Sequence, residues 1–499
     1  MRLRRTLIAA AGIGLLAPFA GAGTAVADEA DWKVTATGPT TALAAGGTFG
    51  VHAVVVDTGT GAPVPGATVS VFAEWESDTP LTGTTDEAGA ADIAFPLKSN
   101  APLEIDVLDA DGDFVTSTEI QPVFIPPKPT LTLTPATTAP YQAQYAKLKG
   151  VSTYQLNGVL QRRRVGGTAW STVDGTAYYY KQALLWAPAT GDYEFRLSTL
   201  AQPDYGLAAT VSNTVRIHVA GTAPAWLTTL NALRAKAGAG PVAWDAQANK
   251  DAALHARYMA VNHVMCHCET AGKPYYSAKG NDVAQGSLIA LQAGVPAKTD
   301  LAKLSVEGLS TAPFHSIDLL SKREAVVGMG TYRSGGYTAE DVYLYGNHAA
   351  EAILYRNNRV QMFPGNGQVL PAYETNGPNE TPSPYTACTG YAAGKSGTPL
   401  WVTVGDPGFE GLDKRLVGYK PKLRSVTLTE NGKKVPVCSF TSDTYRNTSA
   451  GTKAQVRDEL DFYNAAVVVP AKPLKRGAKY SATVVTQKET IRWSFSVAK

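Results

Sequence analysis

The segment "HVMCHCE" (residues 263–269) places two histidines, two cysteines and a glutamate within seven positions. The chain of 499 residues holds only 7 histidines and 4 cysteines, so this density is far above its background composition. Two neutral imidazoles with a carboxylate suit zinc or another divalent metal and leave coordination positions for water. His263 and His267 would share one helical face if the preceding helix continues through them. The segment therefore indicates a metal site, a disulfide anchor or a catalytic centre.

The four cysteines allow three disulfide pairings. Cys388 and Cys438 both lie in the C-terminal strand-rich segment, and we predict that they pair with each other. Cys266 and Cys268 would then form a tight C-x-C disulfide or remain thiols. Thiols of exported chains usually become disulfides, and an oxidised sulfur no longer ligates a metal.

The first residues have the pattern of a secretory signal peptide. Three arginines among the first five residues precede an apolar stretch (residues 7–19), and "AVA" at 25–27 provides a cleavage signal. No later apolar run is long enough to span a membrane. We therefore expect cleavage after Ala27 and a secreted, extracellular chain without a transmembrane segment.

The charge balance of the mature chain argues against nucleic-acid binding. The chain holds 45 basic and 42 acidic residues, and removal of the signal's three arginines leaves 42 of each. A formally neutral chain has no general attraction for polyanions, and no polybasic patch indicates an anionic lipid surface.

A chain of this length is expected to divide into several domains. Residues 28–125 and 126–221 contain short period-two runs between turns, which predict two antiparallel β-sandwiches. Residues 222–350 change to helical spacing followed by strand-like runs, which predicts a compact mixed domain. Residues 351–499 return to strand spacing and predict a C-terminal β-sandwich. The expected fold class is multidomain α+β.

Three helices are expected in the mixed domain. The first ends at Gly238, the second runs from a cap at Asp245 to about Asn262, and the third covers residues 300–309. His255 lies inside the second helix. We interpret it as a buried, hydrogen-bonded scaffold residue and not as a ligand.

The order of these pieces resembles a CAP domain of the SCP/PR-1 superfamily (cysteine-rich secretory protein, antigen 5 and pathogenesis-related 1), of the actinobacterial type. The matching motifs are "LNALRAKAG" in the first helix, "AWD" and "AALHA" around the second, and "TAPFHSIDLL" followed by "VVGMG". The resemblance covers residues 224 to about 348. The flanking segments are similar to the Ig-like modules of bacterial exported proteins.

The resemblance implies an α-β-α sandwich with a surface cleft that holds two histidines and two acids. The family's histidines correspond to His267 and His315 of this chain. The glutamate of the family's G-E-N-x-A motif is missing, because the chain reads "KGNDVAQG" there. Glu307 or Glu269 would have to supply the acid in its place.

The resemblance also implies a function. A secreted CAP protein of this kind would recognise a lipid, glycan or extracellular protein through the cleft, with the β modules as spacers or adhesive surfaces. A divalent metal such as zinc would bind at His267, His315 and His263. Two alternatives stay open, a metal-assisted hydrolase acting on peptide or cell-wall material and a structural envelope protein with a vestigial cleft.

Sequence motifs of catalysis do not decide among these functions. The chain contains no G-x-S-x-G, no H-E-x-x-H and no glycine-rich phosphate loop. The resemblance implies a binding module and so favours a non-catalytic role, and the sequence leaves the ligand, the metal and the oligomeric state open.

Overall fold

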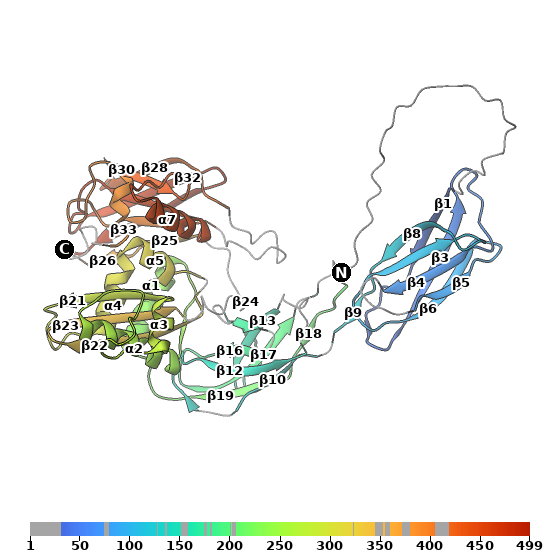
Figure 1. Cartoon of the computed structure of the whole chain (residues 1–499), viewed down its shortest axis with the longest axis horizontal. Helices are drawn as coiled ribbons and strands as arrows, with labels where there is room; N and C mark the ends of the chain where they lie inside the picture. The colour runs from blue at the N-terminus through green and yellow to red at the C-terminus, as the bar shows by residue number, and fades with distance from the viewer. Residues whose placement is uncertain are drawn as a thin grey trace, which may run out of the picture. The chain divides into compact units, whose positions relative to one another are not determined.

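The structure of the protein is a computed structural model (Figure 1). It describes residues 31–73, 79–126, 128–134, 137–150, 158–173, 177–179, 182–199, 201, 206–322, 324–344, 353–354, 360–371, 380–404 and 419–499. The predicted signal peptide lies outside the described residues. Within the described part of the chain, no helix has the length and apolar character needed to cross a membrane. The chain divides into two compact units, residues 1–122 and 123–499.

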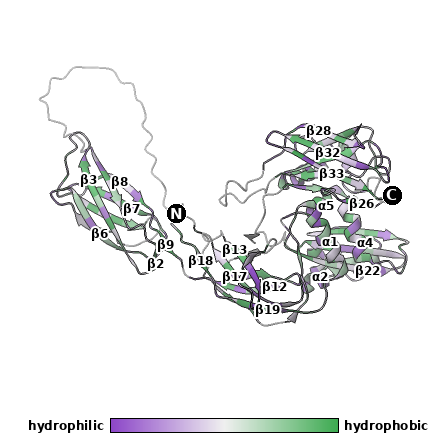
Figure 2. Ribbon diagram, turned by 180° about the vertical axis from the view of Figure 1, so that it is seen from behind, coloured by the Kyte–Doolittle hydropathy of each residue, from purple (hydrophilic) through white to green (hydrophobic). Residues whose placement is uncertain are grey.

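The first unit is an antiparallel β-sandwich with sheets ordered β1-β3-β6 and β5-β4-β7-β8. Side chains alternate between the two faces of a strand, and apolar and polar residues alternate along the strands of this unit (Figure 2). The apolar residues of "FGVHAVVV" and of its partner strands form one core. The period-two run "FGVHAVVV" is confirmed as part of a strand, Thr48–Asp57. Its strands are β1 (Trp32–Thr37), β2 (Leu43–Ala44), β3 (Thr48–Asp57), β4 (Thr68–Ala73), β5 (Leu81–Thr84), β6 (Ala90–Pro96), β7 (Leu103–Leu108) and β8 (Phe114–Ile120).

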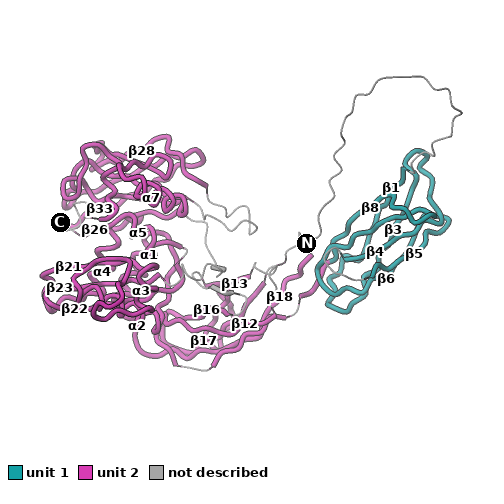
Figure 3. The backbone as a smooth tube through the Cα atoms, viewed as in Figure 1, with its two compact units in different colours: residues 1–122 teal, residues 123–499 magenta. Residues whose placement is uncertain are grey.

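The second unit (magenta in Figure 3) begins with two further sheets. They are ordered β10-β12-β16-β15-β24 and β11-β19-β17-β13-β14, with β18 beside β17, and enclose a core of their own. The strands are β9 (Phe124–Ile125), β10 (Thr130–Thr132), β11 (Thr137–Thr138), β12 (Gln144–Lys149), β13 (Gly158–Arg164), β14 (Ser171–Thr172), β15 (Ala177–Tyr179), β16 (Gln182–Leu185), β17 (Gly191–Thr199), β18 (Thr210–Val211), β19 (Val215–Val219) and β24 (Ile353–Leu354).

Residues 225–344 form three layers around a sheet ordered β20-β22-β23-β21. Helices α2 and α3 pack on one face of this sheet, and α1, α4 and α5 pack on the other. The elements are α1 (Ala225–Ala237), β20 (Ala243–Trp244), α2 (Ala246–Asn262), α3 (Ala278–Ala284), β21 (Ser287–Ala293), α4 (Leu301–Thr311), α5 (Pro313–Leu319), β22 (Val326–Ser334) and β23 (Tyr337–Leu344).

The helix boundaries in this region follow from local capping. Gly238 ends α1 in the left-handed conformation at φ 90°. The side chain of Asp245 accepts a hydrogen bond from the backbone N–H of Ala248 and so begins α2. Both predicted caps and the predicted end of α2 at Asn262 are confirmed.

Helix α2 lies very close to strand β22 because the strand presents Gly328 and Gly330 to it. A Cβ atom at Gly330 would overlap the backbone of Ala252 and Ala253. Replacing Gly330 by alanine should therefore lower the free energy of unfolding by about 2 kcal/mol, as overpacking of a core typically does. Urea unfolding monitored by circular dichroism measures this change.

The matched control is alanine at Gly308, an exposed position inside α4. No atom outside the helix's own neighbouring backbone lies within 4 Å of the added Cβ. This variant should gain about 0.5–1 kcal/mol, because alanine replaces glycine within a helix. Equal stability of the Gly330 variant and the wild type would contradict the close packing of α2 on β22.

The C-terminal part of the second unit combines two sheets with a helix. The sheets are ordered β25-β27-β31-β30 and β26-β33-β32-β28-β29. Its elements are β25 (Gln361–Phe363), β26 (Val369–Leu370), the 3-10 helix η2 (Pro384–Ala387), β27 (Leu400–Thr403), β28 (Leu423–Glu430), β29 (Lys433–Val435), β30 (Val437–Thr441), α7 (Ala450–Phe462), β31 (Ala465–Pro470), β32 (Lys479–Thr486) and β33 (Thr490–Val497).

Helix α7 departs from the all-β sandwich predicted for residues 351–499. Only Val456 and Leu460 of this helix are buried, so its helical period depends on a single i, i+4 pair. A single apolar pair at this spacing does not distinguish a helix from the strands predicted on either side of it.

The hydrophobic core continues from the helices α1, α4 and α5 into the C-terminal sheets. Phe314 of α5 packs edge-on against Tyr445, with ring centroids 6.1 Å apart. The indole N–H of Trp401 donates to the hydroxyl of Ser316, also on α5, at 2.6 Å. The C-terminal residues therefore lie directly against the helix that carries His315.

Candidate functional site

His267 and His315 line the same pocket, a cavity of about 470 Å³. The wall combines residues of the three-layer region with residues of the C-terminal part, from segments far apart in the sequence. The lining residues are His267, Gln285, Gly286, Ser287, Leu288, Phe314, His315, Asp318, Leu344, Thr381, Pro382, Gln455 and Glu459.

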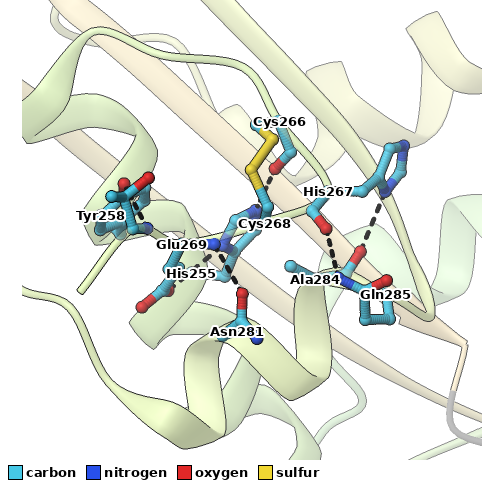
Figure 4. The surroundings of a disulfide bond; sticks show 10 residues. His255, Tyr258, Cys266, His267, Cys268, Glu269, Asn281, Ala284 and Gln285 are labelled. Carbon is cyan, nitrogen blue, oxygen red and sulfur yellow. Dashed lines mark hydrogen bonds and ion pairs between the residues drawn. A yellow bond between two sulfur atoms is a disulfide. The ribbon is translucent and has the colours of Figure 1, made fainter.

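His267 lies in the loop between α2 and α3, exposed at the pocket wall (Figure 4). Its Nδ1 is 2.9 Å from the carbonyl oxygen of Ala284. A carbonyl oxygen only accepts, so Nδ1 carries the hydrogen and donates it. In the neutral imidazole, Nε2 therefore keeps a free lone pair.

The cysteines that flank His267 are bonded to each other. Cys266 and Cys268 form a disulfide across a sequence separation of 2, so their sulfurs are not available as thiolate ligands. Cys388 and Cys438 form the second disulfide, which is the predicted pairing. Of the two states left open for the C-x-C pair, the structure has the disulfide.

His263 does not share a helical face with His267, because the condition for it, a helix that continues through both residues, is not met. Helix α2 ends at Asn262, and His263 takes the left-handed conformation at φ 52°. Its ring stacks on Tyr337, with centroids 4.2 Å apart. The chain leaves the helix before the i, i+4 relation can form, and His263 is not among the pocket-lining residues.

Glu269 and His255 form a buried pair behind the loop (Figure 4). Both side chains are fully buried, and His255 Nδ1 lies 3.2 Å from Glu269 Oε1. His255 Nε2 donates to the carbonyl of Cys266 at 3.0 Å, so a proton between Nδ1 and Oε1 satisfies both partners. Burial raises the pKa of Glu269, although the Ser277 N–H opposes this. The prediction that His255 is buried and hydrogen-bonded is confirmed.

Neither acid predicted for the cleft lies on the pocket wall. Glu269 faces His255, and Glu307 lies on α4, 3.8 Å from the ammonium of Lys303. A Cβ atom at Gly280 would overlap the Glu269 carboxylate. The Glu269 carboxylate thus lies next to Gly280, in the motif that lacks the family's glutamate. It does not line the pocket.

The acidic partner of His315 is Glu380, which sequence reasoning missed. Its Oε1 accepts from His315 Nδ1 at 2.6 Å and from the His315 backbone N–H at 3.0 Å. The Glu380 side chain is fully buried, and that of His315 is 18% exposed. The two residues are 65 positions apart, and "GPNETPSPY" contains no pattern that marks Glu380.

Carboxyl groups surround His315 and set the electrostatics of the pocket. Burial raises the pKa of Asp318 to about 6, against opposing effects of Tyr463 and His315. Burial also raises the pKa of Glu459, to which the charges of Asp318 and Glu380 add. Burial disfavours a charged His315, yet the hydrogen bond and charge of Glu380, with Asp318, outweigh it and raise the pKa of His315.

The residues of the pocket do not assemble a three-ligand metal site. Within the described ranges, no three side chains of His, Cys, Asp or Glu lie in a metal-ligating group. Zinc sites generally need three protein ligands or more. We derive no metal-dependent step, and the divalent metal expected at His267, His315 and His263 stays a prediction.

Residues 227–347 match the family model described as CAP, the cysteine-rich secretory protein family. The matched interval runs from α1 to just beyond β23 and contains both His267 and His315. The chain therefore carries a CAP domain, and Glu380 lies outside it. No curated protein matches the chain.

Several solved structures align with parts of the chain at low similarity. The C-terminal 282-residue fragment of intimin, in complex with the intimin-binding domain of its translocated receptor, is 13% identical with a TM-score of 0.23. That alignment covers 38% of this chain and 64% of the fragment. Invasin, titled a bacterial integrin-binding protein, is 12% identical with a TM-score of 0.21, covering 93% of this chain and 79% of invasin.

The Yersinia pseudotuberculosis adhesin InvE is 14% identical with a TM-score of 0.24, covering 39% of this chain and 61% of InvE. TM-scores this low do not establish a common fold. We draw no argument from these three alignments.

Proposed function

We propose that this chain is an extracellular binding protein whose pocket takes a small ligand with a positively charged amine, such as an amino sugar. One observation carries the proposal. His267, His315 and the carboxyl groups of Asp318 and Glu459 line a single cavity of about 470 Å³. A cavity of this volume is within the range of small-molecule sites.

The charges of the pocket favour a cation. Glu380 pairs with His315, whereas Asp318 and Glu459 add carboxyl groups, and no lysine or arginine is among the described residues of the pocket wall. An ammonium group beside them would favour their ionised forms, because an opposite charge lowers the pKa of a carboxyl group. His267 adds the lone pair of Nε2 as a further acceptor.

The remaining wall suits a polar ring with hydroxyl groups. Amide and hydroxyl side chains offer hydrogen bonds, and Leu288, Phe314 and Leu344 provide an apolar surface. The polar members are Gln285, Ser287, Thr381 and Gln455. A few polar groups on a mainly apolar wall are typical of sites that orient a small ligand.

The extracellular location is supported by two features. The sequence begins with the predicted signal peptide, and all four cysteines are in disulfides. Disulfides persist in oxidising compartments. The N-terminal β unit and the second pair of β sheets would serve as spacers or adhesive surfaces.

Glucosamine and N-acetylglucosamine test the proposal by isothermal titration calorimetry, because they differ in the charge on one nitrogen. We expect glucosamine to bind at least about tenfold more tightly, which corresponds to 1.4 kcal/mol. Its affinity should rise from pH 5 to pH 7.5, because Asp318, whose pKa is about 6, loses its proton over this interval.

The Glu459→Gln variant should lose about tenfold in affinity for glucosamine, which again corresponds to 1.4 kcal/mol. The Glu307→Gln variant is the control, because Glu307 lies outside the pocket, and it should bind as the wild type does. Equal affinity for the two sugars, or binding of lauric acid and neither sugar, would overturn the proposal.

A further inference from the structure

We infer that Glu380, which lies outside the matched CAP interval, is the positioning residue of His315, so that the C-terminal part of the chain completes the pocket. The inference deepens the proposed function and takes the ligand from it. The contact between Glu380 and His315 does not depend on which ligand binds.

The contacts of Glu380 fix both the ring and the backbone of His315. A single oxygen, Oε1, accepts from the ring Nδ1 at 2.6 Å and from the backbone N–H of the same residue at 3.0 Å. Because the backbone group can only donate, Oε1 acts as an acceptor, and Nδ1 holds the hydrogen. The ring cannot turn over without losing this contact, and Nε2 is the nitrogen that remains for the pocket.

The second reason is the burial of the carboxylate. The Glu380 side chain is fully buried, and no described residue donates to its other oxygen, Oε2. A buried carboxylate is costly unless it is paired and hydrogen-bonded. An apolar residue would fill this space at lower cost if packing were the only requirement. The charge of Glu380 is therefore best explained by its contact with His315.

The segment that bears Glu380 is itself held in place at the pocket. Thr381 and Pro382, which follow directly, line the cavity. Tyr385 is buried in the shared core, and Cys388 ties the segment to β30 through its disulfide. On the opposite side, Trp401 holds Ser316, the neighbour of His315. Both members of the pair thus lie on fixed backbone.

The ring tautomer of His315 tests this inference in the full chain. With ¹⁵N- and ¹³C-labelled histidine, and the signal assigned by its loss in His315→Gln, nuclear magnetic resonance should show the neutral ring as the Nδ1–H tautomer. In Glu380→Met, whose side chain offers no oxygen acceptor, the strongly deshielded Nδ1 proton should disappear and Nε2–H should become populated. Glucosamine affinity should fall about tenfold, which is 1.4 kcal/mol.

The control Glu307→Gln should leave the tautomer as in the wild type. A wild-type ring with Nε2–H as its main neutral tautomer would overturn the inference, even if the Glu380 variant did not fold. An unchanged tautomer in a folded Glu380→Met variant would overturn it as well. If the tautomer changes as expected but glucosamine binds to neither protein, the positioning role stands and the proposed ligand fails.

Discussion

Replacing Cys388 and Cys438 together by alanine should lower the free energy of unfolding of the second unit by about 4 kcal/mol. The bridge spans 50 residues, and the chain-entropy model assigns a loop of that length about 4 kcal/mol. Cys388 is also buried in the core shared by α5 and the C-terminal sheets, so its packing is lost too. Urea unfolding of the variant and the wild type under the same non-reducing conditions measures the difference.

The matched control removes the other disulfide. Cys266 and Cys268 are separated by only 2 residues, so the same model gives their bridge about 1 kcal/mol. The two double variants should therefore differ clearly in stability. Equal losses from both would show that loop closure does not set the contribution of the larger bridge.

Acidification from pH 7 to pH 4 should remove about 3 kcal/mol of stability through His255 alone. Burial lowers the pKa of His255 to about 4, against the hydrogen bond to the Cys266 carbonyl, whereas a free histidine titrates near 6.5. Between pH 4 and pH 6.5, His255 is therefore protonated in the unfolded chain and neutral in the folded chain. The contribution is fully present above pH 6.5 and is lost as the pH falls toward 4.

The measurement is the difference between wild type and His255→Gln in the free energy of unfolding across this pH range. The raised pKa of Asp318 acts in the opposite direction, because the folded state binds its proton first as the pH falls. Both proteins retain Asp318, so its effect cancels in the difference. Met259→Leu, buried on the same helix without a titrating group, is the control and should follow the wild-type slope. A parallel slope in His255→Gln would contradict the prediction.

The parts of the fold that were predictable from the sequence depend on local rules. Gly238 and Asp245 end and begin helices through their own conformations and side chains. The alternation in "FGVHAVVV" assigns each residue to a face without knowledge of the partner strand. His263 shows the limit of such rules, because its spacing from His267 left open whether the helix continues, and the left-handed conformation of His263 ends it.

The site was predictable only in part. His267 and His315 belong to motifs that the CAP resemblance identifies, and both line one pocket. Glu459 lines that pocket, and Glu380 contacts His315 behind the wall, because the C-terminal part packs on α5. Neither residue has a sequence pattern, since their role depends on contacts between segments far apart in the chain.

The Cys266–Cys268 bond closes a small ring whose middle member is His267. The ring restricts the backbone of His267 before a ligand binds. Less conformational entropy is then lost on binding. The bond itself persists only under oxidising conditions. Under reducing conditions the ring would therefore open, His267 would be less constrained, and the pocket would bind its ligand more weakly.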